Sequence, residues 1–194
     1  VPSYNIEVNE LFEYIIEIDD PDNDDFLFII ENEPDGMVLD ENGIITWIPT
    51  VTESYPGIII TVTDTDQDNP LSDSQEFSLD VRLSQSFSLS IGSNLISYLG
   101  VLQDNTIENM LLPLSGNITQ ISTENSASIQ LEDGSWIGSL DYIEPTKGYW
   151  IRLNEGADYG VSTYQTSIDQ SYSLHLGWNL ISYIGDDAVA LDDA

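Results

Sequence analysis

The feature that most constrains this chain is an alternation of apolar and polar residues that runs from Phe12 to Val81 and is interrupted by turns. In residues 12–18 every second position is aromatic or aliphatic, whereas Glu13 and Glu17 take the opposite face. The later runs are FLFII, IITWI, GIIITVTD and EFSLDV, separated by the turn sequences PDG, DENG and DTDQDNPLSDS. Period-two runs bounded by turn residues predict short strands, and strands in series predict an all-β sandwich.

The composition changes near residue 84, where acidic loops give way to Ser, Gly and Asn. Residues 105–112, NTIENMLL, predict one short helix, and the segments NITQIST, ASIQLEDGSWIGSL and KGYWIRL predict further strands. We therefore expect two domains: a sandwich over residues 1–83 and a second β-rich module over residues 84–194.

An internal repeat links the two ends of the second module. Residues 86–100, SFSLSIGSNLISYLG, recur at 171–185 as SYSLHLGWNLISYIG, with ten of fifteen positions identical. Each copy predicts a hairpin of strand, tight turn and strand, so the second copy is expected to bury the side chains of Leu174, Leu176, Leu180 and Ile181 or their neighbours. The second copy either closes the second module or opens a further repeat at residue 171.

The charge balance excludes several classes of partner. The chain has 35 Asp and Glu against 3 Lys and Arg, a formal charge of −32. Phosphate binding needs clusters of Lys and Arg, so we expect neither nucleic acid nor an anionic membrane surface as a partner. Such a surface is screened by the medium, which suggests a marine or halophilic source.

Cysteine and long apolar runs are both missing from the sequence. Disulfides, thiolate metal sites and thiol redox chemistry are therefore not available to this chain. No apolar run approaches the roughly 20 residues of a membrane-spanning helix, so membrane insertion is not expected. Because the sequence begins at Val1, we expect it to be a piece of a longer, processed protein.

Residues 1–83 also carry an ordered series of short motifs. They are DPDND at 20–24, Pro34, GM at 36–37, LD at 39–40, GI at 43–44, TW at 46–47, PT at 49–50 and VTD at 62–64. This order and spacing resemble the bacterial cadherin-like or immunoglobulin-like repeats of surface proteins. Asn23 stands where that family usually has Gly, a mild change because Asn also tolerates turn conformations. The resemblance implies an immunoglobulin/cadherin-like β-sandwich.

The second half resembles a Gly-Trp-Asn-Leu-Ile-Ser repeat module of secreted bacterial proteins. The motifs that carry this resemblance are residues 177–182, GSWIGSL at 134–140 and EPTKGYW at 144–150. The resemblance brings no established activity with it, and it implies only an extracellular setting.

In an immunoglobulin-like sandwich, successive strands reverse direction, so the loops after the second, fourth and sixth strands meet at one end. Here those loops are residues 19–25, 40–43 and 64–73, which we call the acidic pole. Oxygen ligands converging from several loops suit Ca²⁺, which binds six to eight of them. The predicted ligands are Asp20, Asp22, Asp24, Asp40, Asp64, Asp66 and Asp68.

Two alternatives to calcium between sandwich loops stay open at this point. The first alternative is an EF-hand that starts at Asp20, with acids at positions 1, 3 and 5 and Glu31 at position 12. Against it, Asp25 stands at position 6, where Gly is needed, and the flanking segments alternate as strands rather than helices. The other alternative is a solvated acidic surface without a specific ion, because acids also occur far from this pole.

Other chemistry is weakly supported by the sequence. His175, the one histidine, is predicted to be a solvent-facing strand residue, and no Ser-His-Asp triad can be built around it. Trp47 and Trp150 lie in apolar runs and are predicted to be core residues. Trp136 and Trp178 adjoin turns, which makes them the candidates for stacking on a sugar.

The function expected from the sequence is non-catalytic. We expect a structural or adhesive module of an extracellular or cell-surface bacterial protein, with Ca²⁺ as a structural ion. Its partners are expected to be neighbouring modules of the same chain and a cell-surface protein or glycan. The alternative is a carbohydrate-binding accessory region of a secreted hydrolase.

Overall fold

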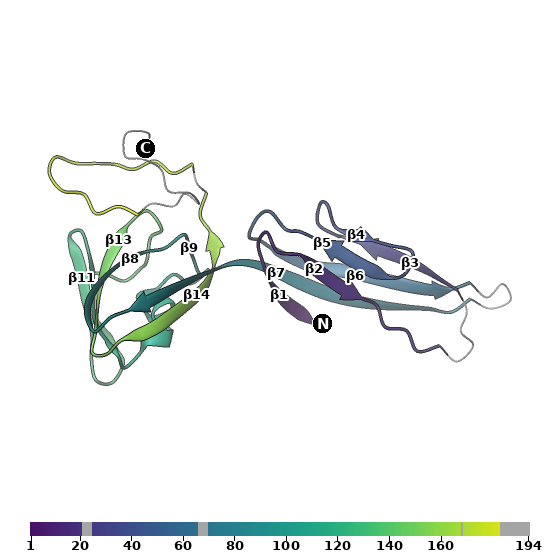
Figure 1. The fold of residues 1–194 in the computed structure, drawn as a ribbon, viewed down its shortest axis with the longest axis horizontal. Coiled ribbons are helices and arrows are strands. Elements are labelled where there is room, and N and C mark those ends of the chain that lie inside the picture. Colours follow the sequence, from purple (N-terminus) through teal and green to yellow (C-terminus); the bar gives the residue numbers. More distant parts are fainter. Residues whose placement is uncertain (21–24, 66–69, 168, 183–194) are drawn as a thin grey trace. The chain divides into compact units, whose positions relative to one another are not determined.

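The computed structural model describes residues 1–20, 25–65, 70–167 and 169–182 (Figure 1). Strands dominate the described residues, several sheets are antiparallel, and these residues contain one short α-helix, so the all-β prediction is confirmed. Within the same residues, no helix is long and apolar enough to cross a membrane. The chain divides into two compact units, residues 1–82 (unit 1) and 83–194 (unit 2). That each is an independent domain stays a prediction.

Unit 1 is built from the alternating runs at the start of the sequence. Its strands are β1 (Ser3–Glu7), β2 (Phe12–Ile15), β3 (Phe26–Glu31), β4 (Val38–Leu39), β5 (Ile44–Trp47), β6 (Ser54–Asp64) and β7 (Ser72–Leu89). The last of these is 18 residues long and continues from unit 1 into unit 2.

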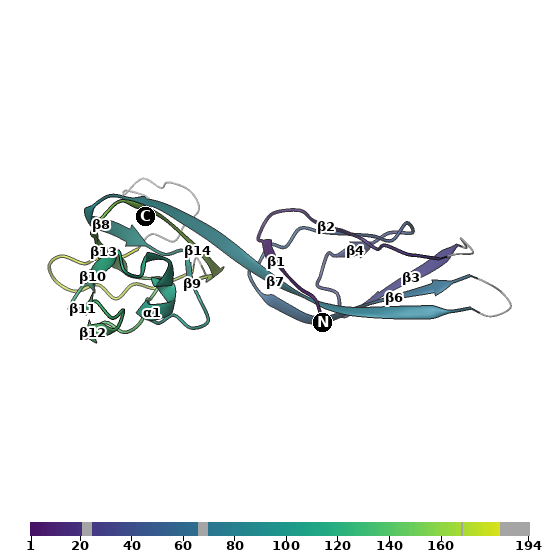
Figure 2. The same cartoon turned by 90° about the horizontal axis from the view of Figure 1, so that it is seen from below.

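The strands of unit 1 form two sheets that lie as separate layers (Figure 2). One sheet has the order β2-β5-β4, with all pairs antiparallel. The other has the order β3-β6-β7, also antiparallel, and β1 runs parallel to β7 along its far edge. Each sheet therefore presents one face to the other and one to solvent.

The core of unit 1 fills the space between these two sheets. Ile45 and Trp47 of β5 and Ile58 of β6 are at most 5% exposed. Aromatic contacts cross from one sheet to the other: the rings of Trp47 and Tyr55 lie 5.1 Å apart edge to face, and Tyr14 stacks on Phe77 at 6.2 Å. Such offset and edge-to-face pairs add to the free energy gained from burial alone.

Unit 2 contains the last part of β7 and a second series of elements. They are β8 (Gly92–Ser97), β9 (Gly100–Val101), α1 (Ile107–Met110), the 3₁₀ helix η1 (Leu112–Leu114), β10 (Ile118–Thr123), β11 (Ser126–Gln130), β12 (Trp136–Gly138), β13 (Gly148–Leu153) and β14 (Ala157–Gln165).

The helix is shorter than the predicted span 105–112. Thr106 caps it by accepting a hydrogen bond from the backbone N–H of Asn109 at 3.5 Å. Pro113 lacks a backbone N–H and disfavours helical geometry in the residue before it, so the chain tightens into η1 after one α-helical turn.

The sheets of unit 2 show that the first repeat copy forms a β-arch. One sheet runs β12-β11-β10-β13-β8, and the other contains β7, β14 and β9. Consecutive strands β7 and β8 thus lie in different sheets, as do β13 and β14. The β7 arm pairs with β14, Leu89 opposite Ala157, and β8 pairs with β13, Gly92 opposite Leu153. The predicted hairpin is therefore wrong, since its two arms pair with other strands.

The core of unit 2 lies between the two layers and centres on three buried tyrosines. Tyr98 and Tyr149 are fully buried, and Tyr159 is 1% exposed. The rings of Tyr98 and Tyr159 meet edge to face, and the Tyr159 hydroxyl donates to the carbonyl oxygen of Met110 at 2.6 Å. The core therefore satisfies the polar ends of its largest side chains, as buried hydroxyls require.

The prediction that the second repeat copy packs like the first is wrong. Residues 171–182 form no strand, and Ile181 makes an isolated bridge with Lys147. Leu174 is 64% exposed, Leu176 is 104% exposed and Ile181 is 48% exposed. The reason lies in the arch itself: because its arms do not pair with each other, a copy without partner strands cannot form a ladder or cover its apolar side chains.

Candidate functional site

The described parts of the acidic pole's loops lie together at one end of unit 1. Backbone hydrogen bonds join them: the N–H of Ile16 donates to the Gly43 carbonyl at 3.0 Å, and that of Thr65 donates to the Asp25 carbonyl at 2.9 Å. These bonds connect the loop after β2 with the loops after β4 and β6. The convergence follows from strand reversal, as counting the strands predicts.

Asp40 shapes its own turn. Its Oδ1 accepts hydrogen bonds from the backbone N–H groups of Ile44 at 2.8 Å and Asn42 at 2.9 Å, and its Oδ2 accepts from the Asn42 side chain at 3.2 Å. The hydrogen bond from Ile44 is the main reason that the pKa of Asp40 is lowered. These bonds favour the carboxylate form and hold the DENG turn closed.

The other predicted metal ligands divide between described and undescribed positions. Asp64 accepts a hydrogen bond from the backbone N–H of Leu71 at 3.0 Å, and Asp20 is partly exposed. The remaining predicted ligands, Asp22, Asp24, Asp66 and Asp68, lie outside the described residues. Among the positions that are described, no three or more His, Asp or Glu side chains form a group that could hold a metal ion. The calcium site therefore stays a prediction.

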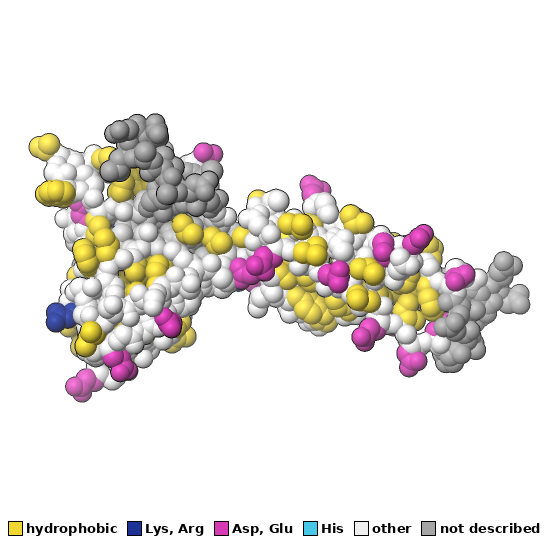
Figure 3. Space-filling model, viewed as in Figure 1, with side chains coloured by type: hydrophobic (Ala, Val, Ile, Leu, Met, Phe, Trp, Pro, Cys, Tyr) yellow, Lys and Arg dark blue, Asp and Glu magenta, His cyan; other side chains and the backbone are white. Residues whose placement is uncertain are grey.

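A cleft lies beside the pole, between the two sheets of unit 1. Its floor is apolar, with Tyr14 from β2, Phe26 from β3, and Ile60 and Val62 from β6. Acidic residues lie among its lining side chains, namely Glu17, Asp19, Asp20, Asp64 and Asp73. On the face shown in Figure 3, acidic side chains are spread over both units while cationic ones are scarce. The acidic residues that line this cleft are thus part of an acidic surface that extends beyond it.

The tryptophans differ from their predicted environments in one case. Trp47 is 5% exposed and donates from Nε1 to the Asp35 carbonyl at 3.1 Å, so its assignment to the core is confirmed. Trp150 is 47% exposed, so the core prediction for it is wrong. In β13 the alternate residues Tyr149 and Ile151 are fully buried, which turns Trp150 outward.

The sugar-stacking candidates are also distinguished by exposure. Trp136 is partly buried and packs against the hydrophobic core of unit 2, whereas Trp178 is 96% exposed. Trp150, which the sequence argument missed, lies on the outer face of the five-stranded sheet directly opposite Leu95, itself 52% exposed. The signal was present in the sequence, because the charged Arg152 has the same parity as Trp150 in this strand.

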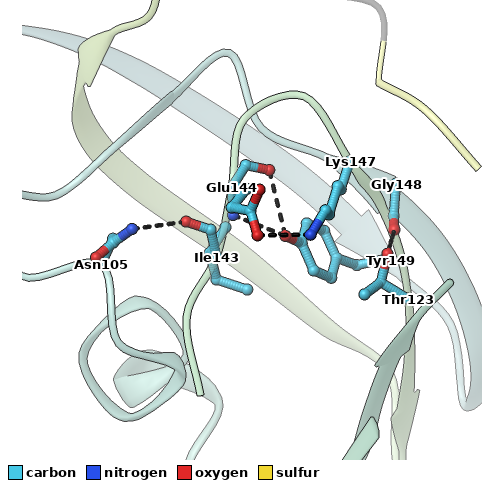
Figure 4. Close-up of polar contacts among 7 residues, drawn as sticks. All are labelled: Asn105, Thr123, Ile143, Glu144, Lys147, Gly148 and Tyr149. Atoms are coloured by element: carbon cyan, nitrogen blue, oxygen red, sulfur yellow. Dashed lines mark hydrogen bonds and ion pairs between the residues drawn. The ribbon is translucent and has the colours of Figure 1, made fainter. Parts of the chain in front are cut away.

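The EPTKGYW motif forms a turn that is held by Tyr149 (Figure 4). The Tyr149 hydroxyl accepts a hydrogen bond from the backbone N–H of Glu144 at 2.7 Å, and Lys147 Nζ lies 2.5 Å from Glu144 Oε1. Thr123 donates to the Gly148 carbonyl at 2.8 Å, and Asn105 donates to the Ile143 carbonyl at 2.9 Å. These contacts give the motif a structural role in anchoring the start of β13.

His175 is exposed, as predicted, but it does not lie in a strand. Its Nε2 lies 2.5 Å from Glu124 Oε1 and its Nδ1 lies 3.1 Å from the Leu176 carbonyl. Its pKa is raised, first by the hydrogen bond to that carbonyl and then by Glu124. Neither contact supplies a nucleophile, so the pair resembles a surface ion pair more than a catalytic dyad.

Comparison of the chain with protein-family models and with curated proteins found no match in either case.

Proposed function

We propose that unit 1 is a cadherin-like immunoglobulin-fold module, and that the chain is a non-catalytic structural or adhesive part of a secreted or cell-surface bacterial protein. The strand order is the observation that supports this most. In the immunoglobulin fold, strands B, E and D share one sheet and strands C, F and G share the other. Taken as B to G in chain order, β2 to β7 give the sheets β2-β5-β4 and β3-β6-β7.

The first strand, β1, differs in its sheet from strand A of the constant-type domain. In that domain strand A lies in the sheet of strands B, E and D. Here β1 runs parallel to β7, with Ile6 opposite Val81, and so extends the sheet of β3, β6 and β7. This pairing covers part of an otherwise open strand edge, which limits edge-to-edge association between modules.

We propose that Ca²⁺ binds at the acidic pole of this module. Ca²⁺ would be held by carboxylates from the loops after β2 and β6, with Asp20, Asp22, Asp24, Asp64, Asp66 and Asp68 as its ligands. Asp40 adds negative charge nearby, while its oxygens are already engaged in the DENG turn. The ion supplies local charge neutralisation and cross-links loops, which would stiffen the end of the module.

Calorimetric unfolding with and without a chelator tests whether Ca²⁺ binds. Extracellular modules bind Ca²⁺ with dissociation constants of about 10⁻⁴ to 10⁻³ M. At ten times that concentration, binding would stabilise the folded state by about 1.4 kcal/mol. Chelation should then lower the melting temperature by roughly 4 to 8 °C per kcal/mol.

The controls separate a specific site from general screening. Asp22→Ala should abolish the calcium response, whereas Asp133→Ala, in a turn of unit 2, should keep it. Sodium chloride at matched ionic strength should not reproduce the whole of the response. If it does, the specific ion is lost from the proposal, while the module assignment, which depends on strand order, is unaffected.

A second candidate function is carbohydrate binding as an accessory region of a secreted hydrolase. The exposed Trp178 and Trp150 favour it, because aromatic faces in contact with water can stack on sugar rings. A glycan array decides between the two candidates. A hit that is lost in Trp150→Ala or Trp178→Ala but kept in Trp136→Ala would favour the accessory region, and the absence of any hit favours the structural module.

A further inference from the structure

The turn of the second repeat copy has the same hydrogen bonds as the turn of the first. In the first copy, Asn94 accepts from the Ser90 N–H at 2.9 Å and donates to the Ser90 carbonyl at 2.8 Å. In the second, Asn179 accepts from the His175 N–H and donates to the His175 carbonyl, both at 3.0 Å. The local geometry of the arch therefore forms in both copies.

The two copies differ in what covers their apolar side chains. Leu89 and Ile96 of the first copy are 7% and 6% exposed, while the equivalent Leu174 and Ile181 are 64% and 48% exposed. Residues at the turn are exposed in both copies, as in Ile91 at 72%. The second copy thus carries the core-facing side chains of the first at the same positions, without a core to receive them.

The strands that pair with the first arch are already engaged within unit 2. β13 pairs with β8 along one edge and with β10 along the other, and residues 157–163 of β14 pair with β7. The second arch contacts unit 2 without forming a ladder. The Gly148 N–H donates to the Leu180 carbonyl at 3.3 Å, the Ser182 N–H donates to the Thr146 carbonyl at 3.2 Å, and Ile181 makes an isolated bridge with Lys147. His175 adds its ion pair with Glu124.

We propose that residues 171–182 are the preformed first arch of another unit like unit 2. Their binding partner is a polypeptide segment resembling residues 101–170, which supplies strands equivalent to β13 and β14. The β13-like strand pairs with one arm and the β14-like strand with the other. Leu174 and Ile181 then enter a core like that around Tyr149 and Tyr159. This inference goes beyond the proposed function and does not require calcium.

Cysteine labelling tests the proposal, because the native chain has no cysteine. The test protein is the chain in which residues 101–170 are repeated directly after residue 185. Leu174→Cys is the reporter and Leu176→Cys is its matched control, since the equivalents of these positions are buried Leu89 and exposed Ile91. Each variant is compared in the native-length and the extended chain, and a scrambled extension of equal composition is run in parallel.

We expect the extension to slow thiol labelling of the Leu174→Cys reporter by about tenfold or more, because a buried thiol reacts only through local opening. The Leu176→Cys control should keep its rate, and the scrambled extension should change neither. Equal rates for the reporter in the extended and native-length chains would overturn the proposal. Protection of the reporter in the native-length chain that grows with protein concentration would instead assign the arch to a second copy of the chain, and would also overturn it.

Discussion

Gly43 lies in the tight turn between β4 and β5, where two constraints exclude a side chain. Its φ is +76°, and a Cβ built there would lie 2.8 Å from the ring of Phe28. We expect Gly43→Ala to destabilise unit 1 by about 1–3 kcal/mol, measured by urea unfolding, because it combines left-handed strain with a steric clash.

Gly36 supplies the matched control for this substitution. Its φ is +82°, but no atom lies within 4 Å of its would-be Cβ. Gly36→Ala should therefore show the conformational cost alone, about 1–2 kcal/mol. Phe28→Leu should reduce the additional cost of Gly43→Ala in the double variant. If both glycine variants lose the same stability, contact with Phe28 does not constrain the turn.

The buried tyrosines of unit 2 give it a predicted alkaline limit. Burial raises the pKa of Tyr149 and of Tyr159 from 10.0 to about 12. The folded state therefore keeps its phenol protons at a pH where the unfolded chain loses them. Stability is intact below pH 10.0 and falls as pH rises toward 12, by about 1.4 kcal/mol per pH unit for each tyrosine.

Urea unfolding across this pH range, with tyrosinate absorbance as a second signal, measures the effect. Tyr159→Phe should flatten the pH dependence, since it removes one of the titrating groups. It should also lower stability at neutral pH, because the Met110 carbonyl loses its hydrogen bond. A slope unchanged from that of the native chain would show that Tyr159 does not titrate with unfolding.

At the scale of elements, the two arches allow the turn to be separated from the packing. Asn94 connects the arms of an arch that is paired on both sides, whereas Asn179 connects arms without ladder partners. Asn94→Ala should lower the stability of unit 2 by about 0.5–1.5 kcal/mol, the value of a typical hydrogen bond. Asn179→Ala should leave the global melting temperature unchanged. Equal losses in calorimetry would mean that the second arch belongs to the cooperative core.

At the scale of the whole molecule, the formal charge of −32 makes stability depend on salt. Repulsion among so many carboxylates favours the expanded, unfolded chain, and added salt screens it. We expect the melting temperature to rise steadily with sodium chloride, and potassium chloride to give the same curve. A clear difference between these salts would indicate specific monovalent binding and contradict simple screening.

Much of unit 1 could be predicted because its information is local and periodic. Residues 26–31 and 44–47 are short apolar runs bounded by turn residues, which predicts the strands, whereas their burial alternates only in the folded structure. The strand count also predicted which loops meet at one end. In unit 2 the strand β14 was not predicted from the sequence. Its residues Tyr159, Val161 and Thr163 face inward and alternate with exposed positions.

The sequence by itself determined the features whose causes lie within a few residues. These are the all-β class, the DENG turn held by Asp40, and the Asn-centred turn that forms in both repeat copies. Tertiary structure alone decided that the first copy is an arch and that the second copy is uncovered. The physical reason is that a strand's partners, and so the burial of its side chains, come from segments far along the chain. Two similar sequences therefore share one turn but differ in their environments.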